Sequence, residues 1–234
     1  METAQIQMKT LATINVTGPD AFDFLQGQLS NDLRRLDAEA EILAAWCNPK
    51  GRVIWFGTVR AIESGFALSA PASTAADIVK RLTVFRFRSK VAFDIIDEGV
   101  TVDPAFLVQH GYAYIDEEQC EQFTPHMLNL DLLDAISFDK GCYTGQEIVA
   151  RTQFKGATKR RTLRYESEAP VSVGDKISDG TRDIGEVLNV AGTDLLAVVP
   201  VDKADNALTV NDVKLTHIPL PYDISLDPAA KRRS

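Results

Sequence analysis

Residues 140–147 read KGCYTGQE, and this octet is the most informative part of the 234-residue chain. It places a single thiol, Cys142, directly after Gly141 and three residues before Gly145. Because glycine lacks a Cβ, it allows the backbone to take a positive φ or to approach a ligand closely. The octet therefore predicts a tight turn built around one cysteine.

The residue types around Cys142 allow two interpretations. Lys140 and Arg151 are cations close to it in the sequence, and nearby positive charge stabilises a thiolate. Free cysteine is also among the most buried residue types, so Cys142 is alternatively a small apolar residue at a turn. Local chemistry alone leaves both a reactive and a structural thiol open.

Composition indicates a soluble globular protein. The chain is 45% hydrophobic and 25% charged, which is typical of folded domains, and its length fits one large or two small domains. Its formal net charge of −8 gives no reason to expect binding to DNA or direct binding to RNA.

Targeting signals and cysteine usage both point to the cytoplasm. No apolar stretch approaches the roughly 20 residues that span a bilayer, and the N-terminal segment lacks the basic and apolar pattern of a signal peptide. The three cysteines are odd in number and widely spaced, which argues against a disulfide framework. We therefore expect a cytoplasmic location without membrane association.

Residues 1–157 show the pattern of an α+β body. The first expected helix carries apolar residues at three- and four-residue spacing, namely Phe22, Leu25, Leu29 and Leu33. The expected order is a helix from residue 17, strands at 42–47, 52–62 and 66–69, a helix at 73–82 and a strand at 90–96. Such an order suits a sheet that is covered by helices on one face.

The character of the chain changes after residue 158. Short β-rich segments, separated by Gly, Asp, Asn and Pro, predict a small antiparallel barrel or sandwich over residues 158–226. The segments are 161–165, 176–178, 185–191, 194–199 and 213–217. Residues 227–234 are expected to form a flexible tail.

Standard motifs for phosphates, dinucleotides and metals are missing. The sequence has no P-loop, no GxGxxG, no HExxH, no paired CxxC and no EF-hand loop, which predicts no tightly bound metal. An iron–sulfur cluster generally needs four ligands, so a lone Cys142 can supply at most one shared or transient ligand.

The octet and the segment after it, IVARTQFKGATKR, resemble the signature of the YgfZ family, the folate-binding iron–sulfur assembly proteins related to the glycine-cleavage T protein. Other stretches agree with the family in the same order. They are FLQGQLSND from Phe24, LAAWCNPKGRV from Leu43, FTPHMLNLDLLDAISFD from Phe123 and THIPLPYDI from Thr216. The resemblance covers most of the chain, with a weak region between about residues 97 and 122.

The resemblance implies a T-protein-like α+β body, the fold of the aminomethyltransferases, followed by a C-terminal antiparallel β-barrel. It also implies a protein that binds tetrahydrofolate or a one-carbon derivative and helps to assemble or repair iron–sulfur clusters, with iron–sulfur enzymes or their assembly factors as partners. Such clients include radical enzymes that modify tRNA, so any effect on tRNA would be indirect. The alternatives are a folate-dependent aminomethyltransferase with turnover and a non-catalytic interaction scaffold.

The resemblance also implies roles for individual residues. Cys142 and Lys140 are the catalytic candidates, with the Cys142 thiolate acting on a folate-borne carbon, a cluster or a partner thiol. The matching loop of the T protein borders the folate cavity, so Asn31 and Asp32 are expected to line the ligand. The further ligand-binding candidates in and after the octet are Gly141, Tyr143, Gly145, Gln146, Glu147 and Arg151.

A basic run follows the octet on this otherwise acidic chain. It consists of Lys155, Lys159, Arg160, Arg161 and Arg164. Such a local reversal of sign could attract an anionic tail, either the glutamyl chain of a folate, with Lys159 and Arg160 as its ligands, or an RNA backbone. A solvated linker that leads into the barrel is the alternative.

One position departs from the family pattern. The family usually has a carboxylate in a short IEAG-like segment, where the T protein uses it to hold the pterin. The matching segment here is VQHG, residues 108–111, which places the neutral amide of Gln109 at that position. Full-length members also carry several dozen more residues upstream of it. The sequence therefore leaves open the physiological ligand, the clients, turnover and the oligomeric state.

Overall fold

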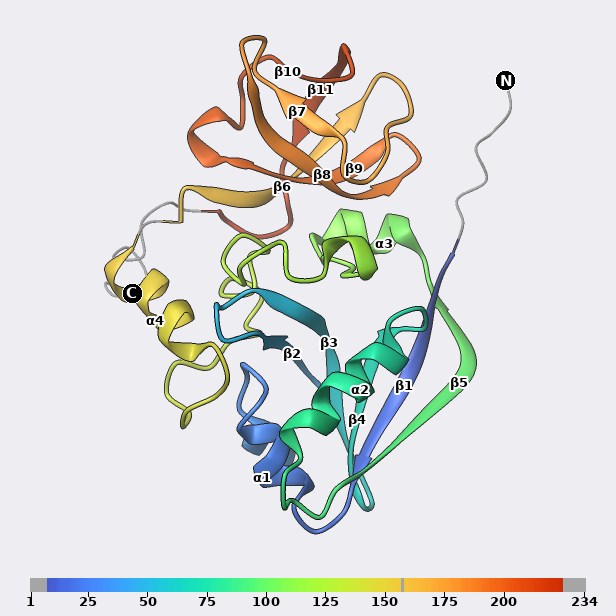
Figure 1. The fold of residues 1–234 in the computed structure, drawn as a ribbon. Coiled ribbons are helices and arrows are strands. Elements are labelled where there is room, and N and C mark those ends of the chain that lie inside the picture. Colours follow the sequence, from blue (N-terminus) through green and yellow to red (C-terminus); the bar gives the residue numbers. More distant parts are fainter. Residues whose placement is uncertain (1–7, 157, 225–234) are drawn as a thin grey trace.

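The structure is a computed structural model that describes residues 8–156 and 158–224. A body of helices around an antiparallel sheet is followed by a closed β-barrel (Figure 1). The predicted tail, residues 227–234, lies outside the described residues.

Five antiparallel strands form the sheet of the body, namely β1 (Lys9–Thr17), β2 (Ile42–Cys47), β3 (Val53–Ile62), β4 (Gly65–Pro71) and β5 (Ala92–Val102). Their order across the sheet is β2-β3-β4-β1-β5. Four of them are predicted from the sequence, and β1 was missed, although Ala12, Ile14 and Val16 alternate with more exposed residues as a half-buried strand requires.

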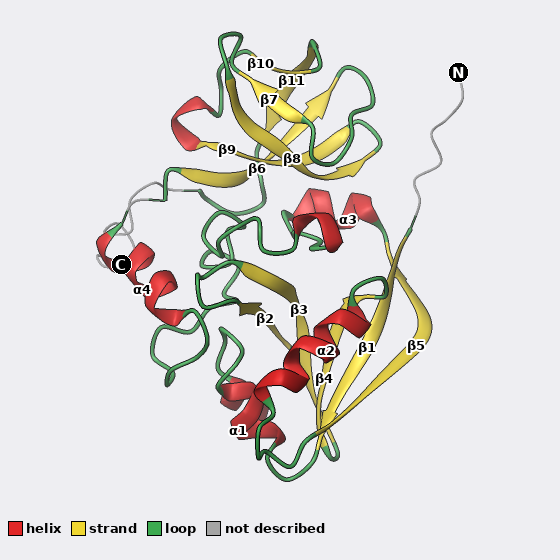
Figure 2. Ribbon diagram, viewed as in Figure 1, coloured by secondary structure: helices red, strands yellow, loops and turns green. Residues whose placement is uncertain are grey.

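The helices are α1 (Ala21–Gln26), α2 (Ala75–Phe85), α3 (Pro104–His110) and α4 (Gln146–Lys155), with short 3₁₀ helices at Leu33–Asp37, Glu117–Gln119 and Val201–Lys203. Helices α1 and α2 cover one face of the sheet (Figure 2). Leu25 of α1 and Ile78 of α2 share a core there with Ile14 and Leu68 of the strands. This arrangement is the helix-covered sheet that the pattern predicted.

The first helix is shorter than expected. It ends at Gln26, and Leu29 instead forms an isolated β-bridge with Trp46. The backbone leaves the helix there because the Ser30 N–H donates to the Ala45 carbonyl of β2, and the carbonyls of Gln26 and Leu29 accept hydrogen bonds from the ammonium of Lys140. The expected apolar stripe is nevertheless largely buried, and only Phe22 is exposed.

The closed barrel contains β6 (Arg160–Ser167), β7 (Lys176–Ser178), β8 (Asp183–Ala191), β9 (Asp194–Pro200), β10 (Leu208–Val210) and β11 (Val213–Ile218). The strands follow the order β10-β11-β6-β9-β8-β7 around it. All five predicted segments are strands, and only the three-residue β10 was missed. The predicted α+β body with a C-terminal antiparallel barrel is therefore confirmed.

The barrel packs on α3 and on the lead-in to the octet, which cover the second face of the sheet. Phe56 of β3 shares a core with Leu128 from the lead-in to the octet and with Leu196 of β9. A buried ion pair also connects the barrel to the body. The Arg161 guanidinium of β6 donates two hydrogen bonds to the Asp131 carboxylate of the lead-in, at 2.8 and 2.9 Å. Over the described ranges, no helix is long and apolar enough to cross a membrane.

Candidate functional site

The octet forms a loop that leads into α4, and buried and exposed residues lie side by side in it. Lys140 and Tyr143 are buried, whereas Gly141 and Cys142 between them are exposed. The Tyr143 ring also lies beneath the Lys140 ammonium, which is 5.3 Å from the ring centroid. The loop is thus held at two points, and the thiol lies between them on the surface.

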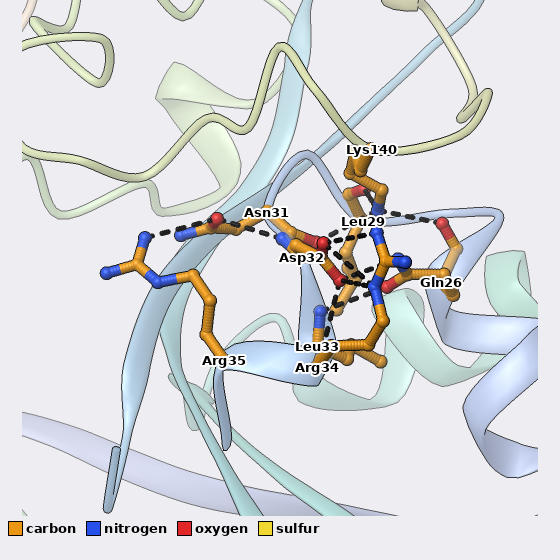
Figure 3. Close-up of polar contacts among 8 residues, drawn as sticks. All are labelled: Gln26, Leu29, Asn31, Asp32, Leu33, Arg34, Arg35 and Lys140. Atoms are coloured by element: carbon orange, nitrogen blue, oxygen red, sulfur yellow. Dashed lines mark hydrogen bonds and ion pairs between the residues drawn. The ribbon is translucent and has the colours of Figure 1, made fainter. Parts of the chain in front are cut away.

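Lys140 is held by the turn that follows α1 (Figure 3). Its Nζ donates to the backbone carbonyls of Gln26, Leu29 and Asn31, at 2.8, 2.7 and 2.9 Å. Burial lowers the pKa of Lys140 to about 8, and the Asp32 carboxylate opposes this shift. Since its three N–H donors are used by carbonyls, Lys140 positions the loop, and its expected catalytic role stays a prediction.

Asn31 is buried, and its amide is fully used within the protein. Nδ2 donates to the carbonyls of Leu43 and Asp134, at 2.7 and 2.8 Å, and Oδ1 accepts from the backbone N–H of Asp32. The two donors of the amide are therefore satisfied without a ligand. Asn31 connects the turn, the start of β2 and the lead-in to the octet, and the expected ligand contact stays a prediction.

Asp32 lies at the edge of the same turn (Figure 3). Its carboxylate accepts from Nε2 of Gln26 at 2.9 Å and from Nη2 of the exposed Arg34 at 2.6 Å. The hydrogen bonds from Arg34 hold the pKa of Asp32 well below its usual range. Asp32 is therefore ionised and already paired, but its partner is a surface side chain that a ligand could displace.

The two glycines of the octet differ. Gly145 has a φ of +84°, and a Cβ there would lie 2.6 Å from the carbonyl oxygen of Asn48. Gly141 has no such requirement, because a Cβ would meet nothing within 4 Å. The predicted need for glycine therefore applies to Gly145, which begins α4 as its N-cap.

The remaining candidates lie on α4 and at the start of the barrel. Glu147 and Arg151 are exposed on α4, and Gln146 is half-buried at its start. Lys159 is exposed before the barrel, whereas Nη2 of Arg160 donates to a barrel carbonyl at 3.3 Å. Two further members of the basic run, Arg161 and Arg164, are engaged in ion pairs with Asp131 and Asp194.

The three cysteines have different surroundings. Cys142 is exposed, Cys120 is half-buried and Cys47 is buried. Burial raises the pKa of Cys47 to about 12 and also raises that of Cys120. Within the described part of the chain, no three His, Cys, Asp or Glu side chains are grouped so that they could hold a metal ion.

A cavity of about 540 Å³ lies on the barrel-side face of the sheet, beneath α3 and the segment after it. Gln109 does not line this cavity; it is exposed on α3. The polar residues that do line it include Glu41, Thr58 and Ser69, which sequence analysis did not single out. No motif marks them, because they come from three separate strands or strand ends.

Comparisons with known proteins agree with these features. The family described as CAF17, C-terminal beta-barrel domain, matches residues 159–221. The chain is 26% identical to the tRNA-modifying protein YgfZ of Serratia proteamaculans, over 94% of this chain and 92% of that protein. It is 28% identical to the protein of the same name from Edwardsiella ictaluri, over 89% of each.

The Serratia alignment extends over 307 positions, so the relative has several dozen residues that this 234-residue chain lacks. A solved structure, the glycine cleavage system aminomethyltransferase T from Bartonella henselae, superposes with a TM-score of 0.72. That similarity covers 89% of this chain and 82% of the other, at 14% sequence identity, and it shows the fold. The chain is thus similar over most of its length to proteins named tRNA-modifying protein YgfZ, and it has the fold of the glycine-cleavage T protein.

Proposed function

We propose that this protein is a cytoplasmic accessory factor that binds a reduced folate and supports the assembly or repair of iron–sulfur clusters in other enzymes. Through those client enzymes it would support tRNA modification indirectly. The relatives named tRNA-modifying protein YgfZ support the link to tRNA, and the aminomethyltransferase fold supports the link to folate.

The observation that carries the proposal is the exposed thiol on an anchored loop. The buried ammonium of Lys140 and the buried ring of Tyr143 fix the backbone on either side of Cys142, whose sulfur is accessible. A single fixed thiol suits a transient bond to a partner sulfur or one shared ligand to a cluster, since one cysteine cannot hold a cluster alone.

The cavity on the sheet supports the folate part of the proposal. Its volume of about 540 Å³ falls within the range of small-molecule sites, and its wall is mostly apolar. Asn31 connects the cavity to the octet. Its side-chain amide donates a hydrogen bond to the carbonyl of Leu43 in the cavity wall, and its backbone carbonyl accepts one from the Lys140 ammonium. Lys159 and Arg160 lie outside this cavity.

Complementation of a strain that lacks its own family member tests the proposal. The wild-type chain, Cys142→Ala and a control variant, Cys120→Ala, would be expressed at matched levels. Activity of iron–sulfur enzymes and the content of modified nucleosides in tRNA would be measured in each strain. We expect the wild type and Cys120→Ala to restore both and Cys142→Ala to restore neither.

Purified Cys142→Ala should unfold at the same denaturant concentration as the wild type, which separates lost function from lost folding. Full restoration by a stably folded Cys142→Ala variant would contradict the proposal.

A further inference from the structure

The loop between α2 and β5 places an aromatic ring in solvent. Phe85, the last residue of α2, packs on Trp46 in the core of the body, with the ring centroids 5.9 Å apart. Phe87, two residues later, is 88% exposed, and Val84 on the last turn of α2 is 70% exposed. Figure 1 shows this loop at the end of the body opposite the barrel. The Phe87 ring is therefore not part of the core.

The backbone of Phe87 is strained. The loop is closed by a turn in which the N–H of Ser89 donates to the carbonyl of Arg86 at 2.8 Å. Within this turn Phe87 has a φ of 42°, a positive value that glycine and asparagine adopt far more readily than phenylalanine. An exposed phenylalanine with a positive φ is unfavourable for folding, so its presence there points to a role outside folding.

Cations flank this ring on a chain whose formal net charge is −8. Arg86, Arg88 and Lys90 are exposed, and none of their side chains forms a hydrogen bond or ion pair with another described residue. The exposed Arg34, by contrast, is paired with Asp32. Together, the exposed residues of this loop form what we call the aromatic–basic tip: Val84, Arg86, Phe87, Arg88 and Lys90.

An open hollow of about 710 Å³ adjoins the tip and is lined by Asp20, Phe87, Arg88 and Ser89. The Asp20 carboxylate accepts the backbone N–H of Lys90 at 2.6 Å, which connects the loop to the start of α1. Because this carboxylate lies in the hollow, the hollow can accept N–H groups, whereas the exposed cations of the tip attract anions. The combination suits a partner that carries both flat rings with N–H groups and a chain of negative charges.

We propose that the aromatic–basic tip binds single-stranded RNA, with one base stacked on Phe87 over the hollow and the adjoining phosphates paired with Arg86 and Arg88. Stacking of unpaired bases on aromatic rings, together with contacts from cations to phosphates, is how proteins hold such strands. The inference goes beyond the proposed function, in which the effect on RNA is indirect, and depends on neither Cys142 nor the cavity. Net charge gave no reason to expect it, because acidic residues elsewhere outweigh the tip.

Other anionic partners match the tip less well. A double helix keeps its bases stacked and paired, so it offers phosphates to Arg86 and Arg88 but no free base to Phe87. An acidic protein surface likewise offers charge without a stack of flat rings. Binding to an anionic membrane typically uses about four to eight clustered cations, and Asp20 would face the negative headgroups.

Fluorescence anisotropy of the full chain with a labelled single-stranded RNA of about 12 nucleotides tests the assignment. The variants are Phe87→Ala, Phe87→Trp and the pair Arg86→Gln with Arg88→Gln. Arg182→Gln with Lys214→Gln is the matched control, since it removes two exposed positive charges from the barrel. Duplex RNA of the same length and vesicles of phosphatidylglycerol and phosphatidylcholine in equal parts are the comparison partners.

We expect Phe87→Ala to weaken binding of the single strand about tenfold, because it removes the stacking surface, and Phe87→Trp to bind as tightly as the wild type or more tightly. The arginine pair variant should weaken binding about tenfold at low salt. It should also reduce the slope of log affinity against log salt concentration by about 1.4, at about 0.7 for each phosphate contact. The barrel control should change neither quantity, and binding of the duplex should be insensitive to Phe87→Ala.

A further variant, Phe87→Gly, separates binding from folding. Glycine adopts a positive φ without strain, so this variant should unfold at a higher urea concentration than the wild type and still bind RNA as weakly as Phe87→Ala.

Three results would each overturn the proposal: no binding of the single strand by the wild type, binding that Phe87→Ala leaves unchanged, and binding of vesicles in place of RNA. An equal loss in the barrel control would do the same, because it would show attraction by overall charge alone. The complementation test of Cys142→Ala is independent of all these outcomes, so the proposed function stands or falls separately.

Discussion

The octet loop and the sheet cavity are built in opposite ways. The octet is one continuous segment, and a single buried ammonium fixes it to three carbonyls of a turn more than 100 residues away. The cavity is assembled from side chains of all five body strands, α3 and the segment after it, and no residue of the octet lines it. The octet loop presents an exposed thiol, whereas the cavity has a mostly apolar lining.

The difference indicates that the two regions bind different kinds of partner. A cavity with a mostly apolar lining suits a small molecule, whereas an exposed thiol on a fixed loop suits a partner that approaches from solvent. Asn31 is the direct connection between the regions, because its carbonyl accepts from Lys140 and its amide donates to the cavity wall at Leu43. Perturbing each region separately, and then the connection, tests this difference.

The largest expected effect follows from Lys140→Met, which keeps an apolar stem but removes the ammonium. The carbonyls of the buried Leu29 and Asn31 and of the half-buried Gln26 lose this donor, at about 1–3 kcal/mol for each buried carbonyl, and removal of the desolvated charge offsets part of that cost. We expect the free energy of unfolding to fall by about 3 kcal/mol in urea denaturation. Lys155→Met, at an exposed position, is the control, and an equal effect of the two changes would contradict the anchoring role of Lys140.

Asn31→Ala should perturb both regions at once. The carbonyls of Leu43 and Asp134 lose this buried donor, so we expect a destabilisation of about 2 kcal/mol. The variant should also weaken ligand binding at the cavity, because Leu43 is part of its wall. Denaturation and calorimetric titration of the same sample would check this, and a loss of stability with unchanged ligand affinity would rule out the connection.

The pH dependence of stability should report on Lys140. Its pKa is about 8 in the folded protein and near 10.5 when unfolded, so the unfolded chain binds more protons between these values. The contribution of Lys140 to the free energy of unfolding is therefore most favourable above pH 10.5. It becomes less favourable as the pH falls from 10.5 and through 8. Between pH 7.5 and 9.5 the wild type should gain about 2 kcal/mol relative to Lys140→Met, by urea denaturation at both pH values. A parallel pH dependence of the two proteins would contradict this.

The smallest effect on stability is expected at the thiol itself. Because Cys142 is exposed, Cys142→Ser should change the free energy of unfolding by less than about 0.5 kcal/mol. In the folded wild type, iodoacetamide should modify Cys142 well before Cys120 and Cys47, as mass spectrometry of digested samples would show. Labelling of all three cysteines only after unfolding would instead support a structural thiol.

Local patterns predicted the parts of the fold that local physics determines. The β2–β3–β4 segment was predicted because apolar runs are separated by the turns at residues 48–51 and 63–65. The first helix was drawn too long because the Ser30 N–H donates to the Ala45 carbonyl of β2 instead of continuing the helix, a tertiary contact that no local pattern encodes.

The site was predictable only where it is contiguous. The octet identified Cys142 as a distinctive thiol, and the structure shows that it is exposed. The burial of Lys140 and the full use of the Asn31 amide depend on tertiary contacts that no local pattern encodes. The same holds for Glu41, since only the folded sheet brings it into one lining with Thr58 and Ser69.

Titration of Cys142→Ser and Glu41→Gln side by side with 5-formyltetrahydrofolate tests the difference between the two regions most directly. The account predicts that Cys142→Ser binds the folate with the affinity of the wild type and that Glu41→Gln, which removes a carboxylate from the cavity lining, binds it about tenfold more weakly. Loss of binding in Cys142→Ser with wild-type affinity in Glu41→Gln would show that the folate sits at the thiol loop, and it would contradict the account.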